Sequence, residues 1–223
     1  MNPFLSQYTT PHGSIPFDKI SISDYENAIL HGIEEENKEI ANIISNQETP
    51  TFDNTILALE KSGNTLRKVT DVFFNQLSCE TSDSLDEMSE KLVPLLTEHS
   101  NSIMLNTSLF KKVEAVVKSH PQRTDEEQKL LEDTYDSFLR HGVALDEQQK
   151  QEYDKLTSEL SVLKLKFAQN KLKEQNGFIL TVTNEDEISG IPQNCKDEAR
   201  AEALRRNMGG WAFTLHAPSY VPF

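Results

Sequence analysis

The residues of this chain with the most potential for chemistry are its six histidines. A hydrolytic zinc site on a helix needs two histidines four residues apart, with a glutamate beside the first as the base. Here the residues that follow the histidines are Gly, Gly, Ser, Pro, Gly and Ala, and no two histidines lie within one helical turn. The sequence therefore lacks both HExxH and the Glu-x-x-His pair of di-iron bundles. The histidines are His12, His31, His99, His120, His141 and His216.

Other common catalytic arrangements are missing as well. Gly209-Gly210 is the only glycine pair, and there is neither a phosphate-binding loop nor a G-x-S-x-G turn for a serine nucleophile. No basic residue flanks Cys79, and a reactive thiolate needs a positive environment. We interpret Cys79 as a half-buried structural cysteine and His99 as a helix-terminal or core-edge residue. We therefore predict no catalytic, cofactor-binding or metal-binding residue in this chain.

Two patterns allow both a functional and a structural interpretation. Glu34, Glu35 and Glu36 fan around a helix at about 100° per residue, which favours a solvated face over a cation site. An apolar stripe with 3-4 spacing is typical of a coiled coil or of antiparallel helix packing. We expect this stripe to be internal core rather than a partner-binding seam, because amphipathic helices mostly serve their own domain. It consists of Tyr153, Leu156, Leu160, Leu163 and Phe167.

The composition of the chain limits the partners and the cellular compartment that we expect for this protein. The chain has 223 residues, with 22 basic and 36 acidic side chains and a net charge of −14. Without clustered Lys and Arg, nucleic acid and anionic membranes are excluded as expected partners. The two cysteines, which lie far apart, suit a reducing compartment, and the N-terminus does not resemble a signal peptide. These features favour the cytoplasm, with the periplasm as the alternative if a signal peptide has been removed.

The apolar periodicity predicts a mainly α fold, a multi-helix bundle of long antiparallel helices with a small two-stranded β element near the C-terminus. Residues 1–20 are expected to form an extended arm that packs through Phe4 and Phe17. Residues 21–176 form the helical bundle. Residues 177–223 form a small β/α element, with "FILTVT" and "WAFTL" as strands around one helix. A lone strand pair is marginal, so these strands are expected to expose an apolar surface through which the chain could dimerise.

Helix starts are indicated by capping residues. Ser23 with Glu26 and Thr124 with Glu127 fit capping boxes, in which each side chain bonds the backbone N–H of the other. Asp53 and Asn106 are candidate single N-caps. The longest helix is expected to begin near Asp146 and to run for about eight turns as the spine of the bundle.

Several stretches, taken in order, resemble the N-terminal region of bacterial peptidyl-dipeptidases. These are thimet-oligopeptidase-like zinc metallopeptidases, related to oligopeptidase A. The resemblance covers nearly the whole chain and is most specific in "TFDNTILALEKSG" and "PSYVPF". The other matching stretches are "NPFL", "PFDKI", "YENAI", "VFFN", "LNTSLF", "FLRHGVALDE" and "LTSELSVLKLKFAQN".

The resemblance implies that this chain is one wall of the substrate channel in a larger zinc enzyme. The parent would release C-terminal dipeptides from short peptides, and its zinc motif would lie in a C-terminal catalytic part that follows residues 177–223. The fragment alone would bind no zinc and would be inactive. Two alternatives stay open: the N-terminal part of an oligopeptidase A-type endopeptidase, and a non-enzymatic helical interaction module.

Overall fold

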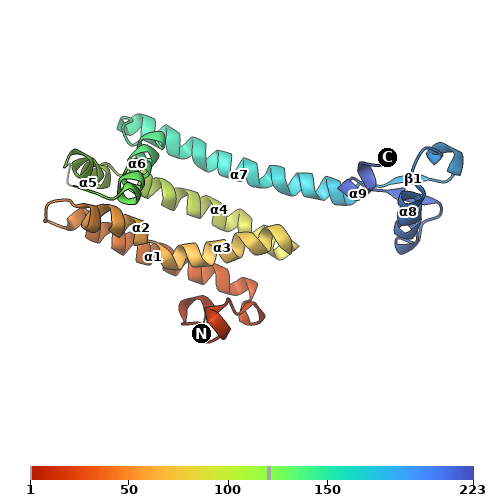
Figure 1. The fold of residues 1–223 in the computed structure, drawn as a ribbon, viewed down its shortest axis with the longest axis horizontal. Coiled ribbons are helices and arrows are strands. Elements are labelled where there is room, and N and C mark those ends of the chain that lie inside the picture. Colours follow the sequence, from red (N-terminus) through yellow and green to blue (C-terminus); the bar gives the residue numbers. More distant parts are fainter. Residues whose placement is uncertain (1, 120–121) are drawn as a thin grey trace. The chain divides into compact units, whose positions relative to one another are not determined.

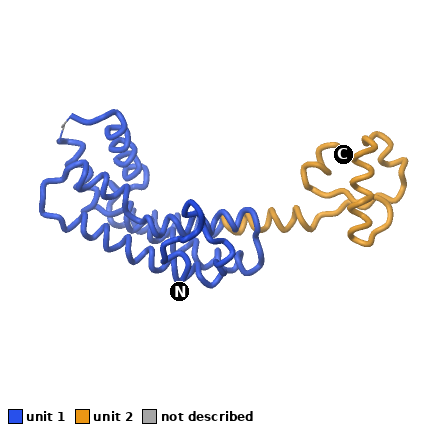
Figure 2. Tube along the Cα trace, turned by 60° about the horizontal axis from the view of Figure 1, so that its bottom comes forward, with its two compact units in different colours: residues 1–163 blue, residues 164–223 orange. Residues whose placement is uncertain are grey.

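A computed structural model describes residues 2–119 and 122–223 and confirms a mainly α fold with a two-stranded sheet near the C-terminus (Figure 1). The chain forms two compact units, residues 1–163 and residues 164–223 (Figure 2). The boundary between them falls inside the helix α7.

The first unit begins with short 3₁₀ helices and continues as α-helices. The 3₁₀ helices are η1 (Pro3–Leu5), η2 (Pro11–Gly13) and η3 (Phe17–Lys19), and η4 (Phe52–Leu57) is a π-helical turn. The α-helices are α1 (Ile22–Ser45), α2 (Ala58–Lys61), α3 (Asn64–Cys79), α4 (Asp83–Met104), α5 (Thr107–Lys118), α6 (Asp125–Arg140) and α7 (Glu147–Gly177), which crosses into the second unit. The second unit continues with β1 (Leu180–Val182), η5 (Glu185–Ile188), α8 (Gln193–Arg205), β2 (Trp211–Phe213) and α9 (Ala217–Tyr220).

The predicted helix caps are partly correct. Thr124 with Glu127 closes a capping box at α6, and Asn106 caps α5 by accepting from the Leu109 N–H. At α1 the prediction is wrong by two residues, because Ser21 is the N-cap and Asp24 is its partner. The first turn before α2 is capped by Thr51, not by Asp53.

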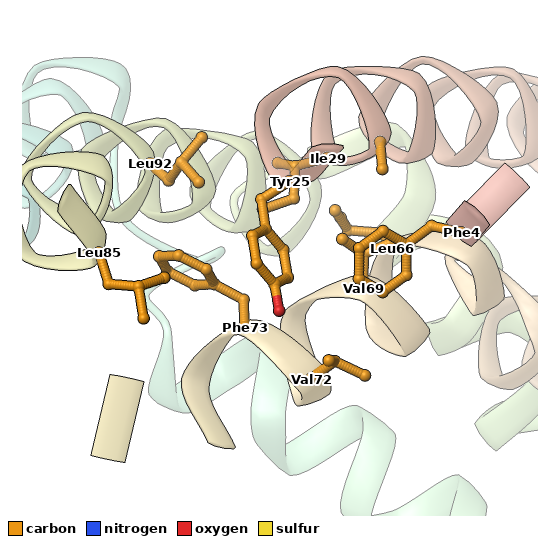
Figure 3. Close-up of a cluster of buried hydrophobic side chains, with 10 residues drawn as sticks. Phe4, Tyr25, Ile29, Leu66, Val69, Val72, Phe73, Leu85 and Leu92 are labelled. Carbon is orange, nitrogen blue, oxygen red and sulfur yellow. The ribbon is translucent and has the colours of Figure 1, made fainter. Parts of the chain in front are cut away.

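The core of the first unit contains two hydrophobic clusters. In the first cluster, Tyr25 of α1 packs against Phe4 of the N-terminal arm and Phe73 of α3, with ring centroids 5.2 and 5.1 Å apart (Figure 3). Phe4 is therefore an anchor of the arm as expected, whereas Phe17 is 48% exposed and the expectation for it was wrong. The second cluster joins the end of α1 to η4, α5 and α6. It is made of Ile40, Ile43, Ile56, Ile103, Leu109, Val113, Val116, Leu131, Phe138 and Val143.

Helix α7 has the predicted length but not the predicted packing. Its residues are all described, and its single buried residue is Lys150. The apolar stripe that we expected in the core is exposed: Leu156 by 57%, Leu160 by 48%, Leu163 by 55% and Phe167 by 72%. The expectation of a packed spine is therefore wrong.

Polar contacts explain this orientation of α7. The Asn101 side-chain amide on α4 donates to Asp154 Oδ1 (2.7 Å) and to Thr157 Oγ1 (2.8 Å). Lys150 Nζ donates to Thr107 Oγ1 at 2.6 Å. These hydrogen bonds attach the polar face of α7 to the first unit, so the apolar face is turned away from it.

The second unit has a core of its own. β1 and β2 pair antiparallel, with Leu180 opposite Phe213 and Val182 opposite Trp211. Val182 and Phe213 pack with Ile188 and Ala199. Gly210 allows the turn into β2, because its φ is +75° and a Cβ there would lie 2.2 Å from Val182 O. The pair thus gains support from η5 and α8.

Candidate functional site

A groove of about 720 Å³ in the first unit is bordered by α1, α2, α3, α4 and α6. Leu66, Phe74 and Ile103 are among its apolar lining residues. Its titratable lining residues are Glu36, Glu60, Arg67, His99, Asp133 and His141. An apolar groove with a few polar groups is the usual form of a small-molecule or peptide site, so this groove is the candidate functional site of the first unit.

An imidazole–carboxylate pair is the most deeply placed polar feature of the groove. His99 Nε2 of α4 lies 2.7 Å from Glu36 Oε2 of α1, and the two side chains are only 6% and 16% exposed. An ionised carboxylate only accepts, so the His99 Nε2–H is the donor. The prediction that residues 34–36 form a solvated face is therefore wrong for Glu36. His99 is a core-edge residue, but it has a partner that we did not foresee.

The start of α3 forms the wall next to this pair. Gly63 precedes α3 with a φ of +67°, and a Cβ on it would lie 2.4 Å from Glu36 Oε1. The Gly63 N–H donates to Glu39 Oε2 at 2.8 Å. A carboxylate at a helix N-terminus is stabilised by the helix dipole, so Glu39 helps to fix α3 against α1.

The spacing of residues on α1 indicates that the Glu36 side chain lies on the buried face of the helix. Ile29, Glu36 and Ile43 are seven residues apart on α1, and both isoleucines are buried. Residues seven apart share a helix face, so Glu36 belongs to the buried stripe of α1 rather than to its wet face. A carboxylate in that stripe needs a partner, which the residue order alone does not identify.

Of the other described histidines, His141 lines the same groove, whereas His12, His31 and His216 are not among its lining residues. His31 pairs with Glu35 at the surface (3.4 Å), His141 Nδ1 lies 2.7 Å from Ser137 O, and His216 contacts Gln175. His12 is exposed, and His120 lies outside the described residues. Among residues 2–119 and 122–223, no group of three or more His, Cys, Asp or Glu side chains could hold a metal ion.

The cysteines lie in different surroundings from those we expected. Cys79 is exposed at the end of α3, with the Ser78 hydroxyl 3.6 Å from its sulfur, so the half-buried interpretation is wrong. Cys195, near the start of α8, lines a pocket of about 340 Å³ in the second unit. In the same pocket, Arg206 and, to a smaller extent, Arg205 donate to Glu202 and lower the pKa of its carboxyl group.

These arrangements support binding and stability more directly than catalysis. The Glu36 carboxylate fixes the ring of His99, and apolar walls surround the pair. One imidazole and one carboxylate supply two metal ligands, whereas a catalytic zinc site uses three. The groove can therefore accept an apolar group next to a polar pair, and nothing in its described geometry assigns it a reaction.

Comparison with known proteins identifies relatives along nearly the whole chain. Dipeptidyl carboxypeptidase of Escherichia coli (strain K12) is 34% identical over 207 residues, which is 92% of this chain. The dipeptidyl carboxypeptidase of Salmonella typhimurium is 33% identical over 85% of the chain. This chain is similar to dipeptidyl carboxypeptidases over most of its own length. Oligopeptidase A of Haemophilus influenzae is also similar, with 27% identity over 99% of the chain. No family model matches the chain.

The chain is much shorter than these homologues. It spans 30% of the length of the Escherichia coli dipeptidyl carboxypeptidase and 32% of the Haemophilus influenzae oligopeptidase A. Both names denote peptidases, which agrees with the family that the sequence motifs indicated. Among the residues that the structure describes, no helix combines the length and hydropathy that a bilayer-spanning segment needs.

Proposed function

We propose that this chain is the N-terminal part of a zinc-dependent peptidyl-dipeptidase, an enzyme that releases dipeptides from the C-termini of short peptides. The observation that carries the proposal is the 34% identity to a protein named dipeptidyl carboxypeptidase over 92% of this chain. Oligopeptidase A-type endopeptidase activity is the second candidate, favoured by a match over 99% of the chain at lower identity.

Each part of the chain has a role in this proposal. Residues 1–20 brace the bundle, residues 21–176 form one wall of the substrate channel, and residues 177–223 lead into the catalytic part. The zinc site lies in the portion of the relatives that this chain does not match. The two free cysteines support a cytoplasmic location for the parent.

The decisive experiment is to sequence the gene beyond codon 223 and to assay its whole product. Two acetylated peptides serve as substrates, identical except that one has a free C-terminal carboxylate and the other an amide. A peptidyl-dipeptidase releases a dipeptide from the free acid only, since it must recognise the terminal carboxylate. An endopeptidase cleaves both peptides.

Two outcomes would contradict the proposal. A stop codon directly after Phe223, with no hydrolysis by the product, would identify a non-enzymatic helical module. Stoichiometric zinc and hydrolysis by the 223-residue chain alone, both lost on mutation of one of its histidines, would show that the chain contains the site. The expected result for the isolated chain is neither zinc binding nor hydrolysis.

A further inference from the structure

Three leucines on the first half of α7 form an uncovered apolar surface of the first unit. Leu156, Leu160 and Leu163 follow one another at spacings of four and three residues, and each is about half exposed. All three belong to the first unit. Residues at these spacings lie along one face of a helix and are the repeat with which two helices interlock. We call these three residues the leucine face.

The first unit holds the other face of α7 through polar contacts. The buried side chains of Asn101 and Lys150 donate to Asp154, Thr157 and Thr107. In the described part of the chain, no residue of α7 belongs to either hydrophobic cluster of the first unit. Turning the leucines inward would take Asn101 and Lys150 away from their hydrogen-bond partners, which is costly for buried polar groups. Any cover for the leucine face therefore comes from outside the first unit.

The area of the leucine face argues against a second copy of this chain as the cover. A fully exposed leucine side chain offers at most about 120 Å² of apolar surface, so three half-exposed ones offer roughly 200 Å². Two copies would bury about 400 Å² of leucine surface, whereas specific interfaces bury at least about 1,200 Å² in total. Each copy also carries a net charge of −14, so two copies repel each other.

A segment of the same polypeptide is not limited in this way. A covalently attached segment is already at a high effective concentration, and it loses little further translational freedom when it docks. A small apolar surface is therefore enough to hold it. The relatives contain additional polypeptide of this kind, because this chain spans 30% of the Escherichia coli dipeptidyl carboxypeptidase and 32% of the Haemophilus influenzae oligopeptidase A.

We propose that the leucine face is covered by a helix in the part of the parent enzyme that this chain does not match. The covering helix presents apolar side chains at the same spacing of three and four residues, since this spacing lets two helices interlock. The inference rests on the proposed function, because only a longer parent supplies the helix. It also explains why the periodicity of α7 indicates a core position: the leucine face is part of the core of the parent.

The test compares hydrogen–deuterium exchange of residues 147–163 in the 223-residue chain and in the whole gene product. A helix that is packed on both faces opens less often, so we expect these amides to exchange at least about tenfold more slowly in the whole product. Peptides from the buried part of α1 are the internal reference and should exchange alike in both proteins.

Two substitutions on α7 assign the protection to the leucine face. Leu160→Glu in the whole product is expected to return residues 147–163 to the exchange rates of the 223-residue chain, because a charge is not tolerated in an apolar contact. Lys155→Glu introduces the same side chain at an exposed position outside the leucine face and should leave the protection intact. Both positions are exposed in the 223-residue chain, so both variants should fold there, which circular dichroism verifies.

Each outcome decides the proposal. Equal exchange of residues 147–163 in the two proteins overturns it, and so does protection that Leu160→Glu reduces no more than Lys155→Glu does. Slow exchange in the 223-residue chain that becomes faster on dilution would identify a second copy as the cover and would also overturn it. An unprotected α7 in an active peptidase leaves the proposed function standing, whereas a gene without any longer product defeats both proposals and is recognised from its sequence alone.

Discussion

Gly32 of α1 and Leu66 of α3 lie in direct backbone contact. A Cβ on Gly32 would lie 2.8 Å from Leu66 Cα and 2.9 Å from its N. This is closer than two non-bonded heavy atoms can approach, so the crossing of α1 and α3 requires glycine at this point. The neighbouring cluster around Tyr25 and Phe73 depends on the same crossing.

Gly32→Ala is therefore expected to destabilise the first unit, although alanine is the better helix former. Overpacking costs about 1–3 kcal/mol, and the gain in helix propensity offsets about 1 kcal/mol of it. We expect a net loss of roughly 1 kcal/mol in the free energy of unfolding, measured by urea denaturation. Asn37→Ala, at an exposed position on the same helix, is the control and should be neutral or slightly stabilising. An unchanged midpoint for Gly32→Ala would contradict the close packing.

Glu36→Gln tests the buried pair with His99. The substitution keeps the shape of the side chain but removes the charge that the imidazole N–H donates to. A hydrogen bond to a charged group contributes about 1.5–3 kcal/mol, and we expect a loss of roughly 2 kcal/mol in urea denaturation. Glu35→Gln is a matched control, because Glu35 faces His31 at the surface of the same helix. We expect that change to cost less than about 0.5 kcal/mol, and equal losses for both variants would refute the distinction.

The environment of Tyr25 predicts that the stability of the folded chain decreases at alkaline pH. Burial, with smaller contributions from Asp24 and Tyr8, raises the pKa of its hydroxyl group to about 12 from its ordinary value of 10.0. Since the folded pKa lies above the unfolded one, the unfolded state loses its proton first. The stabilising contribution is complete below pH 10 and is lost as the pH rises to about 12.

Thermal unfolding followed between pH 9 and 12 checks this expectation against Tyr25→Phe. The variant keeps the ring contacts with Phe4 and Phe73 but loses the hydrogen bond to Gln76, so it should be less stable at pH 8. Its melting temperature should then fall less steeply than that of the unmodified chain above pH 10. Parallel curves would mean that Tyr25 does not titrate in this range.

The cap of η4 gives a local prediction. The Thr51 hydroxyl accepts from the Asn54 N–H, and the Asn54 side chain accepts from the Thr51 N–H. Thr51→Ala should cost about 1 kcal/mol, because it leaves the Asn54 N–H without its acceptor. Asp53→Ala should cost less, since no side-chain hydrogen bond from Asp53 is observed among the described residues. A larger loss for Asp53→Ala in urea denaturation would restore our original assignment of the cap.

Local sequence predicts the presence of a helix better than it predicts the residue at which the helix begins, and the start of α1 shows why. "SISDYE" contains two overlapping capping patterns, Ser21 with Asp24 and Ser23 with Glu26. Both fit the rule, and the choice depends on where the arm leaves the helix. Asn2 Nδ2 donates to Asp24 O, and Ser21 adopts an extended backbone. Such long-range contacts cannot be read from six residues.

The candidate groove was missed for a related reason. His99 and Glu36 are 63 residues apart, and neither carries a recognisable motif. The apolar stripe of α7 was found from its spacing, but its environment was predicted wrongly. A heptad pattern indicates that a helix packs against something and does not indicate whether the partner is in the same polypeptide. Asp154 and Thr157 on the other face accept the hydrogen bonds from Asn101, and these polar residues determine which face of α7 contacts the first unit.

The nearly unburied state of α7 has a consequence for its backbone. Helices in proteins gain most of their stability from packed side chains, and α7 contributes one buried residue, Lys150. Its amide protons should therefore exchange with deuterium much faster than those of α1 or α3, through local opening that leaves the rest folded. Any molecule that settles on the leucines would slow this exchange, which makes the amides of α7 a residue-level sensor of occupancy.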